Sequence, residues 1–240
     1  MGNILFICGS LNQTTQMHAI ARNLMNENNC YFTPYYADGI ENMAARLGWL
    51  NFTVLGGRHR HETEKYLSRH NLNVDPRGET RPYDLVVTCS DLIIQKNIRG
   101  RRVVLVQEGI TEPEGIMYHL VKWLKLSRYL ANTSTSGLSN EYDIFCVASK
   151  GYAELFIRKG VHKEKISVTG IPNFDNLKNA YNNHLPFHGY VLAATSPLRE
   201  TFRPDNRREF ILKCNAIAGE RHLVFKLHPL ENTQRAIREI

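Results

Sequence analysis

Asn3-Ile4-Leu5-Phe6-Ile7-Cys8 is an apolar run of strand length at the start of the chain. Its side chains are apolar on both faces, as in parallel strands that helices cover on both sides. Similar runs alternate with segments of helical length, and we expect further strands at 30–33, 51–55, 84–89, 102–106, 143–147 and 165–169. This alternation predicts an α/β fold with a doubly wound parallel sheet.

The intervening segments predict helices at 13–27, 59–71, 114–131 and 150–159. A polar, Asn-rich stretch at 176–188 is typical of a linker. After it the βα pattern restarts, with strands expected at 190–194 and 222–227, a helix at 206–218 and another helix after His228-Pro229. The sequence thus predicts an N-terminal Rossmann-like domain over 1–183 and the opening βαβ part of a second one over 184–240. Because a free-standing doubly wound domain needs roughly 100 residues or more, we expect the second domain to be incomplete.

The composition narrows the class of protein. The 240 residues are 42% hydrophobic and carry a formal net charge of +7. This hydrophobic fraction excludes wholesale disorder. A membrane-spanning helix needs a run of about 18 apolar residues, and the sequence contains none. The N-terminus lacks the pattern of a signal peptide, so we expect a cytoplasmic protein or one bound to the inner face of the membrane. The basic surplus indicates anionic partners such as nucleic acid, acidic lipid or phosphorylated substrates, although solubility alone also explains it.

The cysteines predict neither a disulfide framework nor a metal site. Their number is odd, their spacing is wide and no Cys-x-x-Cys pair occurs. Four of the five lie in or beside apolar strand-like runs, so we interpret them as small buried hydrophobes in a reducing compartment. These four are Cys8, Cys30, Cys89 and Cys146, and the fifth is Cys214.

Ligands of doubly wound sheets bind beyond the carboxyl ends of the strands, so we expect a site among loops 9–14, 89–92, 107–114 and 170–175. The first of these loops begins with Gly9 and Ser10. It has neither the three glycines of a dinucleotide fingerprint nor the Gly-Lys-Ser/Thr of a P-loop. Gly9 permits a tight turn, and the N-terminus of the next helix offers N–H groups to an anion. A plain strand-to-helix turn is the alternative.

Two of these loops carry acidic residues. Asp91 either caps the helix that follows it or faces the cleft as a carboxylate. Glu108 and Gly109 follow another strong strand, with Glu112 and Glu114 close behind. A carboxylate there suits general-base catalysis or the binding of sugar hydroxyls, whereas Glu112 and Glu114 also suit the first turn of a helix. We take Glu108 and Asp91 as the candidate catalytic residues.

The expected helix within 115–131 is strongly amphipathic. Its apolar face holds Ile116, Leu120, Trp123, Leu124 and Leu130, and the opposite arc holds Tyr118, Lys122, Lys125, Arg128 and Tyr129. We expect the apolar face to pack on the sheet, because every helix of an α/β fold needs an apolar stripe. A helix that lies on a membrane surface, with basic and aromatic residues at the headgroups, is the alternative.

The strongest local feature of the second domain is Phe225-Lys226-Leu227-His228-Pro229-Leu230-Glu231. Pro229 restricts His228 to an extended backbone, which directs it off the strand end. Lys226 is a candidate phosphate contact, His228 a hydrogen-bond donor and Glu231 the start of a helix. A strand terminus with an exposed imidazole is the alternative. The basic stretch 58–62 predicts no metal site, because the two histidines of a His-x-His on a helix point about 200° apart.

Two stretches resemble the GT-B class of nucleotide-sugar enzymes. The first runs from Tyr142-Asp143-Ile144-Phe145-Cys146-Val147-Ala148-Ser149 to Lys165-Ile166-Ser167-Val168-Thr169-Gly170-Ile171-Pro172-Asn173-Phe174-Asp175, and the second is Lys226-Leu227-His228-Pro229. The class includes hydrolysing UDP-N-acetylglucosamine 2-epimerases and CDP-glycerol glycerophosphotransferase-like enzymes of envelope polymers. The resemblance implies two facing Rossmann-like domains, with the acceptor held by the first and an activated donor by the second.

Comparison with the epimerase motifs favours a transferase. Cys89-Ser90-Asp91 keeps only the acid of the epimerases' His-Gly-Asp, and in Gln107-Glu108-Gly109 the carboxylate is displaced by one position. Pro197-Leu198-Arg199-Glu200-Thr201 lacks the histidine of the third motif. The resemblance therefore implies a glycosyl or glycerophosphoryl transfer in polysaccharide biosynthesis, with a 2-epimerase or a non-catalytic nucleotide-sugar-binding module as alternatives.

The resemblance also implies the partners and the remaining site residues. The donor is a UDP- or CDP-linked sugar and the acceptor a saccharide or lipid-linked molecule, with no metal or other cofactor and no nucleic acid. A peripheral membrane contact and a homodimer are compatible with it. The substrate-binding residues it indicates are Gly9, Ser10, Gly109, Gly170, Pro172, Arg199, Lys226, His228 and Glu231.

Overall fold

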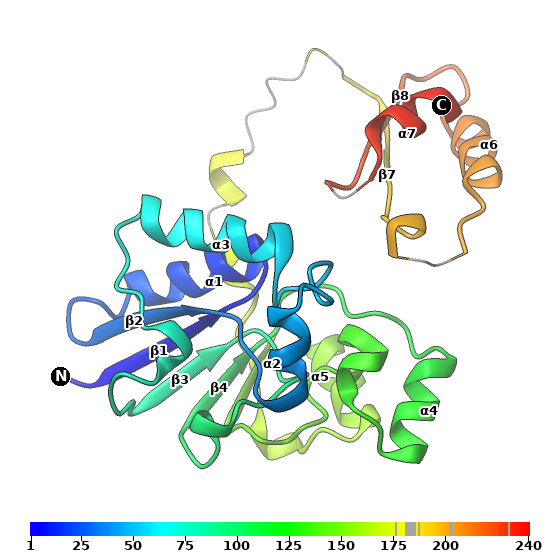
Figure 1. The fold of residues 1–240 in the computed structure, drawn as a ribbon. Coiled ribbons are helices and arrows are strands. Elements are labelled where there is room, and N and C mark those ends of the chain that lie inside the picture. Colours follow the sequence, from blue (N-terminus) through cyan, green and yellow to red (C-terminus); the bar gives the residue numbers. More distant parts are fainter. Residues whose placement is uncertain (176, 181–185, 187, 202–203, 230) are drawn as a thin grey trace. The chain divides into compact units, whose positions relative to one another are not determined.

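A computed structural model describes residues 1–240 except 176, 181–185, 187, 202–203 and 230 (Figure 1). The chain divides into two compact units, Met1–Lys178 and Asn179–Ile240. The division that the sequence predicts, between residues 183 and 184, falls among residues outside the described part. We describe each unit by itself.

Unit 1 is built on a six-stranded sheet in which every neighbouring pair is parallel. The strand order is β2-β1-β3-β4-β5-β6, so the chain first adds β2 on one side of β1 and then continues on the other side. The strands are β1 Asn3–Cys8, β2 Asn29–Pro34, β3 Leu85–Thr88, β4 Val103–Val106, β5 Ile144–Val147 and β6 Ile166–Val168. The switch point at β1 and β3 is where doubly wound sheets open a crevice for ligands.

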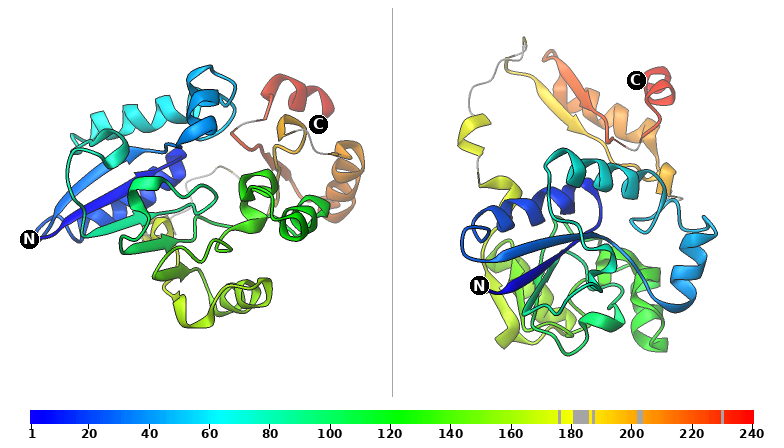
Figure 2. Two further views of the ribbon diagram at one scale, coloured as in Figure 1. Left: turned by 60° about the horizontal axis from the view of Figure 1, so that its bottom comes forward. Right: turned by 60° about the vertical axis from the view of Figure 1, so that its left-hand side comes forward.

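Helices cover both faces of the sheet (Figures 1 and 2). The α-helices of unit 1 are α1 Leu11–Arg22, α2 Gly39–Arg46, α3 Gly57–Arg69, α4 Ile116–Leu124 and α5 Lys150–Lys159. Short 3-10 helices lie between or after them: η1 Pro76–Gly78, η2 Lys96–Ile98, η3 Arg128–Thr135, η4 Lys163–Lys165 and η5 Pro172–Phe174. A sixth, η6 Leu177–Ala180, includes the last residues of unit 1 and the first of unit 2. The α/β, Rossmann-like fold class that the alternation predicts is confirmed.

The core consists of two apolar layers because β1 is buried on both faces. Phe6 packs with Phe32 of β2, Met17 of α1 and Leu67 of α3 on one face of the sheet. On the other face lies Leu5, in a cluster that includes Leu105 and the aromatic rings of Phe145 and Phe156. These two layers fix the strand ends at which the candidate site lies.

Unit 2 is a small βαβ element. Its strands β7 Val191–Ala194 and β8 Leu223–Lys226 pair in parallel, and its helices are α6 Arg207–Ala218 and α7 Thr233–Glu239, with the 3-10 turn η7 Arg199–Thr201. This confirms the strands expected at 190–194 and 222–227 and the helix expected at 206–218. Among the described residues, every helix of either unit is too short or too polar to span a bilayer.

Three expectations of secondary structure are wrong. The helix expected at 13–27 spans Leu11–Arg22, and residues 23–27 form turns. Residues 51–55 form turns instead of a strand. The helix expected over 114–131 ends at Leu124, because Lys125 adopts a left-handed backbone with φ +52° and the chain continues as η3. Its apolar face is exposed rather than packed on the sheet: Ile116 and Trp123 are both 80% exposed, whereas Tyr118 is buried.

Candidate functional site

The turn between β1 and α1 places polar side chains at the carboxyl edge of the sheet. Ser10 is the N-cap of α1 and forms a capping box with Gln13. The Ser10 hydroxyl accepts a hydrogen bond from the backbone N–H of Gln13 at 3.3 Å. In return, the backbone N–H of Ser10 donates to the side-chain oxygen Oε1 of Gln13 at 3.1 Å. These bonds satisfy two of the N–H groups that a helix start leaves unpaired, and they fix the orientation of the Gln13 amide. Gly9 precedes them, and Thr63 of α3 donates to its carbonyl at 2.8 Å.

Glu108 meets this turn from the end of β4. Its Oε1 accepts hydrogen bonds from Ser10 Oγ at 3.1 Å and Asn12 Nδ2 at 3.3 Å, and its Oε2 accepts one from Gln13 Nε2 at 2.6 Å. Gln16, one turn further along α1, donates to the Glu108 carbonyl at 2.6 Å. The carboxylate is therefore held in place by the first turn of α1.

The loop after β6 joins the same group. Gly170 makes the turn with φ +87°, and Pro172 opens η5. The side-chain nitrogen of Asn173 lies 2.8 Å from Asn12 Oδ1 and 3.0 Å from Thr15 Oγ1. The structure thus brings the loops of Gly9, Glu108 and Gly170 together at one edge of unit 1, as the sequence predicts for strand-end loops.

The geometry leaves Glu108 able to bind a hydroxyl group. A carboxylate has about four lone-pair sites, and the three donors found among the described residues occupy two on Oε1 and one on Oε2. Glu108 is half-buried, so Oε2 can accept a further O–H.

The carboxylate of Asp91 is bound by backbone N–H groups. Its side chain is 1% exposed, and its two oxygens accept the backbone N–H groups of Gly137 at 2.9 Å and Ser139 at 3.0 Å. Arg128 donates to its carbonyl at 2.8 Å. Asp91 caps no helix either, because the next helical turn, η2, has Gln95 as its N-cap. These contacts anchor the segment after η3 to the sheet and turn Asp91 away from the Glu108 cluster.

Two other acids follow Glu108 in the same loop. Glu112 is positioned by its backbone, which donates to Thr133 Oγ1 at 3.1 Å, and Glu114 is exposed. Neither begins a helix, since the N-cap of α4 is Gly115. Gly109 follows Glu108 directly, and its carbonyl accepts from Gln107 at 2.7 Å.

In unit 2, two of the predicted binding residues are engaged within the fold. Glu231 is 7% exposed and accepts hydrogen bonds from Arg207 Nη2 at 2.5 Å, from the His228 backbone at 2.7 Å and from Thr195 Oγ1. Burial alone would raise the pKa of Glu231, but these donors outweigh it and the pKa lies below its usual value. Arg199 pairs with Glu239 at 2.6 Å and Asp205 at 3.2 Å.

Lys226 and His228 complete the strand end of unit 2. Lys226 is the last residue of β8 and is exposed, and its carbonyl accepts the Thr195 backbone N–H at 3.0 Å. The His228 backbone N–H donates to Thr195 Oγ1 at 3.2 Å, which holds the residue just past the strand. Both side chains thus belong to the carboxyl edge of the β7–β8 pair.

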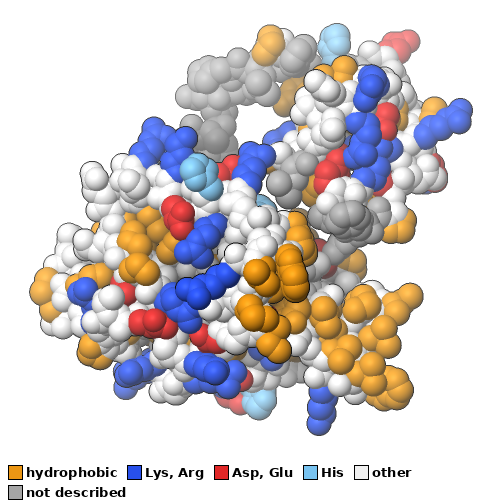
Figure 3. Space-filling view, viewed as in Figure 1, with side chains coloured by type: hydrophobic (Ala, Val, Ile, Leu, Met, Phe, Trp, Pro, Cys, Tyr) orange, Lys and Arg blue, Asp and Glu red, His pale blue; other side chains and the backbone are white. Residues whose placement is uncertain are grey.

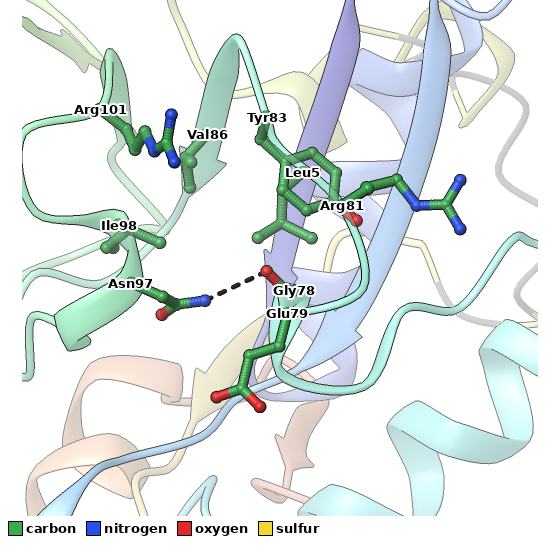
Figure 4. Close-up of a pocket in the computed structure, with 9 residues that line it drawn as sticks. All are labelled: Leu5, Gly78, Glu79, Arg81, Tyr83, Val86, Asn97, Ile98 and Arg101. Atoms are coloured by element: carbon green, nitrogen blue, oxygen red, sulfur yellow. Dashed lines mark hydrogen bonds between the residues drawn. The ribbon is translucent and has the colours of Figure 1, made fainter.

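A cavity of about 200 Å³ lies elsewhere in unit 1 (Figure 4). Its lining residues Gly78, Arg81 and Tyr83 precede β3, and Asn97 and Arg101 precede β4. The side-chain nitrogen of Asn97 donates across it to the Gly78 carbonyl at 3.2 Å (Figure 4). The cavity is therefore at the amino ends of the strands, and the Glu108 cluster at their carboxyl ends is the candidate site.

No family model and no curated protein matches the chain. Among solved structures, that of S. aureus MnaA with UDP matches 100% of this chain and 66% of its own, with 13% identity and a TM-score of 0.54. The fold is shared with MnaA. This likeness agrees with the α/β fold that the resemblance implies, and at 13% identity it extends no further than the fold.

Two further structures match with lower scores. UDP-N-acetylglucosamine 2-epimerase from Rickettsia bellii matches 100% of this chain and 65% of its own, at 10% identity and a TM-score of 0.46. Anabaena Alr3699/HepE in complex with UDP and glucose matches 95% of this chain and 69% of its own, at 14% identity and a TM-score of 0.43. Scores below 0.5 add nothing to the assignment of the fold. The chain thus spans about two thirds of the length of the structures it matches.

Proposed function

We propose that unit 1 is the acceptor-binding unit of a nucleotide-sugar-dependent transferase and that unit 2 contributes to its donor-binding unit. The reaction moves a glycosyl or glycerophosphoryl group from a UDP- or CDP-linked donor to a saccharide or lipid-linked acceptor of an envelope polymer. The observation that carries the proposal is Glu108, a carboxylate held by three donors at the switch-point edge of a sheet whose fold is shared with a UDP-bound protein.

Glu108 is the general base in this proposal. Its Oε2 accepts the proton of the acceptor hydroxyl while that oxygen bonds to the transferred group, and the nucleotide leaves with the electron pair of the broken bond. The amides of Asn12 and Gln13 hold the carboxylate in place during the transfer. Asp91 is left out of the chemistry because its carboxylate is buried against backbone N–H groups.

The remaining predicted residues surround the substrates. Gly9, Ser10, Gly109, Gly170 and Pro172 belong to the loops around Glu108, so we propose them as the backbone of the acceptor site. Lys226 and His228 are the proposed contacts of the donor phosphates in unit 2, since basic side chains stabilise a leaving diphosphate. The ion pairs of Arg199 and Glu231 support the shape of that strand end instead.

The test compares Glu108→Gln with Glu114→Gln, the same substitution at an exposed acid. The full chain is incubated with UDP- and CDP-linked donors and envelope acceptors, and nucleotide release and UDP binding are measured. We expect Glu108→Gln to lower turnover by about 10²–10⁴-fold, the usual contribution of a general base, with UDP binding unchanged. Wild-type turnover in Glu108→Gln would contradict the assignment.

The same assay separates the rival functions. Exchange of solvent deuterium into C2 of the donor sugar would identify a 2-epimerase. Saturable UDP binding without turnover on any acceptor would identify a binding module. Either result would replace the transferase proposal.

A further inference from the structure

The helix α4 presents its apolar face to solvent. Ile116 and Trp123 are each 80% exposed, and Leu124 is 52% exposed. We call the group Ile116, Met117, Leu120, Trp123, Leu124 and Leu126 the α4 surface. It forms a continuous apolar area over α4 in the space-filling view (Figure 3). Exposed apolar areas of this kind mark sites of interaction, because a single soluble domain usually buries such side chains.

The orientation of α4 is fixed by contacts on its opposite side. Tyr118 and Val121 are buried there. The ammonium group of Lys159, on α5, lies 5.2 Å from the centre of the Tyr118 ring, and Lys122 Nζ donates to the Lys159 carbonyl at 3.0 Å. Lys159 is 3% exposed, and its burial lowers the pKa of its ammonium group. Tyr118 and Val121 thus face the protein, and the side chains of the α4 surface are left outside.

The charge of this segment indicates what covers it. Residues 115–140 contain no aspartate or glutamate, but they contain Lys122, Lys125 and Arg128. Lys122 and Lys125 are exposed beside the apolar side chains. Exposed Trp and Leu with neighbouring lysines are the composition of helices that lie in the headgroup region of anionic membranes. A second protein surface would need acidic groups here, whereas anionic lipid supplies them together with an apolar layer.

We propose that the α4 surface docks on an anionic phospholipid bilayer, with Trp123 and Leu124 inserted among the acyl chains and Lys125 at the headgroups. This docking does not depend on the proposed transferase function. Where that function holds, loop 109–115 leads directly from Glu108 to the docked helix, so that a lipid-linked acceptor would enter the site from the membrane side.

The test measures binding of the full chain to vesicles. Trp49 and Trp123 are the two tryptophans of the chain, so Trp49→Phe leaves Trp123 as a single fluorescent reporter. With vesicles of phosphatidylglycerol and phosphatidylcholine, we expect a blue shift of the Trp123 emission, quenching by brominated lipid and co-flotation of the protein. With vesicles of phosphatidylcholine alone, the binding should fall at least tenfold.

Three variants make the test specific. Trp123→Glu should lower vesicle binding more than tenfold, and Lys125→Ser about fivefold, the usual effect of one basic residue near an anionic surface. Ile237→Glu introduces the same charge at a residue of unit 2 that is 68% exposed, and should leave vesicle binding unchanged.

Three outcomes would overturn the proposal. The first is vesicle binding that is absent or equal in wild type and Trp123→Glu. The second is a concentration-dependent dimer that Trp123→Glu abolishes without any vesicle binding, which would make a second copy the occupant. The third is a Trp123 emission that is already blue-shifted in the lipid-free monomer, because another part of the protein would then cover α4.

Discussion

Replacing Asp91 with asparagine should destabilise unit 1 without removing a catalytic group. The Asp91 carboxylate accepts two backbone N–H groups, that of the buried Gly137 at 2.9 Å and that of the half-buried Ser139 at 3.0 Å. An asparagine keeps one acceptor oxygen but turns an NH2 group toward the second N–H. The loss of a bond to a charged acceptor costs about 1.5–3 kcal/mol, and an unpaired buried N–H costs about 1–3 kcal/mol. Allowing for relaxation, we expect a decrease of about 2–4 kcal/mol in the free energy of unfolding.

Urea unfolding followed by tryptophan fluorescence measures this change selectively. Both tryptophans, Trp49 and Trp123, belong to unit 1, so their emission reports the unfolding of that unit. The matched control is Asp143→Asn, because the Asp143 carboxylate accepts a single backbone N–H, that of Val103 at 2.7 Å, at an exposed position. There the amide can present its oxygen to the one donor, and we expect a loss below about 1 kcal/mol.

The reasoning is refuted if Asp91→Asn unfolds at the same urea concentration as wild type or as Asp143→Asn, with an unchanged slope. The same reasoning requires that Asp91→Asn keeps the turnover of the wild type when it is measured at a low temperature, at which the variant is folded. A stable but inactive Asp91→Asn protein would restore Asp91 as a catalytic residue and remove Glu108 as the single proposed base.

Two further predictions concern the core of unit 1. Gly78→Ala should lower the free energy of unfolding by about 2–4 kcal/mol, because φ is +59° and a Cβ would lie 2.3 Å from Leu5 Cδ2. Gly100→Ala is the control, since φ is +73° there but the space around it is open, and it should cost only about 1 kcal/mol in the same urea titration. Burial raises the pKa of Tyr35 to about 12 from its ordinary 10.0, so the neutral phenol stabilises the fold below pH 10 and this contribution is lost between pH 10 and 12. Between pH 10 and 12 the free energy of unfolding should therefore fall more steeply with pH in the wild type than in Tyr35→Phe, by up to about 1.4 kcal/mol per pH unit. Equal slopes in the two proteins would contradict this prediction.

The sheet could be predicted from the sequence because burial on both faces leaves a local signal. Leu5, Phe6 and Ile7 are each buried to 1% exposure or less, and such a run of apolar residues has few other uses in a globular domain. The same apolar signal misled at residues 51–55. There Gly57 packs so closely that a Cβ would lie 2.0 Å from the Asn51 carbonyl oxygen, and the chain turns instead of extending.

The helix α4 shows what periodicity leaves undecided. The sequence separates an apolar arc from an arc with Tyr118 and Lys122, but which arc is covered depends on partners distant in the sequence. Here the partner is Lys159, whose buried ammonium group lies over the Tyr118 ring. The pattern therefore predicted an amphipathic helix correctly. It predicted wrongly which side of that helix faces the protein.

The sequence predicted where the candidate site lies, but it predicted fewer of the hydrogen-bond partners of its residues. The strand-end rule indicated both Glu108 and Asp91, and only the tertiary contacts distinguish a carboxylate bound by side chains from one bound by backbone. Gln13 was missed, although Ser10 and Gln13 have the spacing of a capping box. Asn173 carries no local signal, since its contact with Asn12 joins loops more than 150 residues apart.

The double use of Ser10 and Gln13 constrains how this protein can evolve. Each side chain closes the start of α1 and also donates to Glu108, so under the proposed function a change of acceptor would involve residues that the first helix needs to form. Replacing either one alters both the contacts of Glu108 and the start of α1. Divergence among related sequences should therefore concentrate on Asn12 and the loop of Asn173, where recognition can change while the helix start is kept.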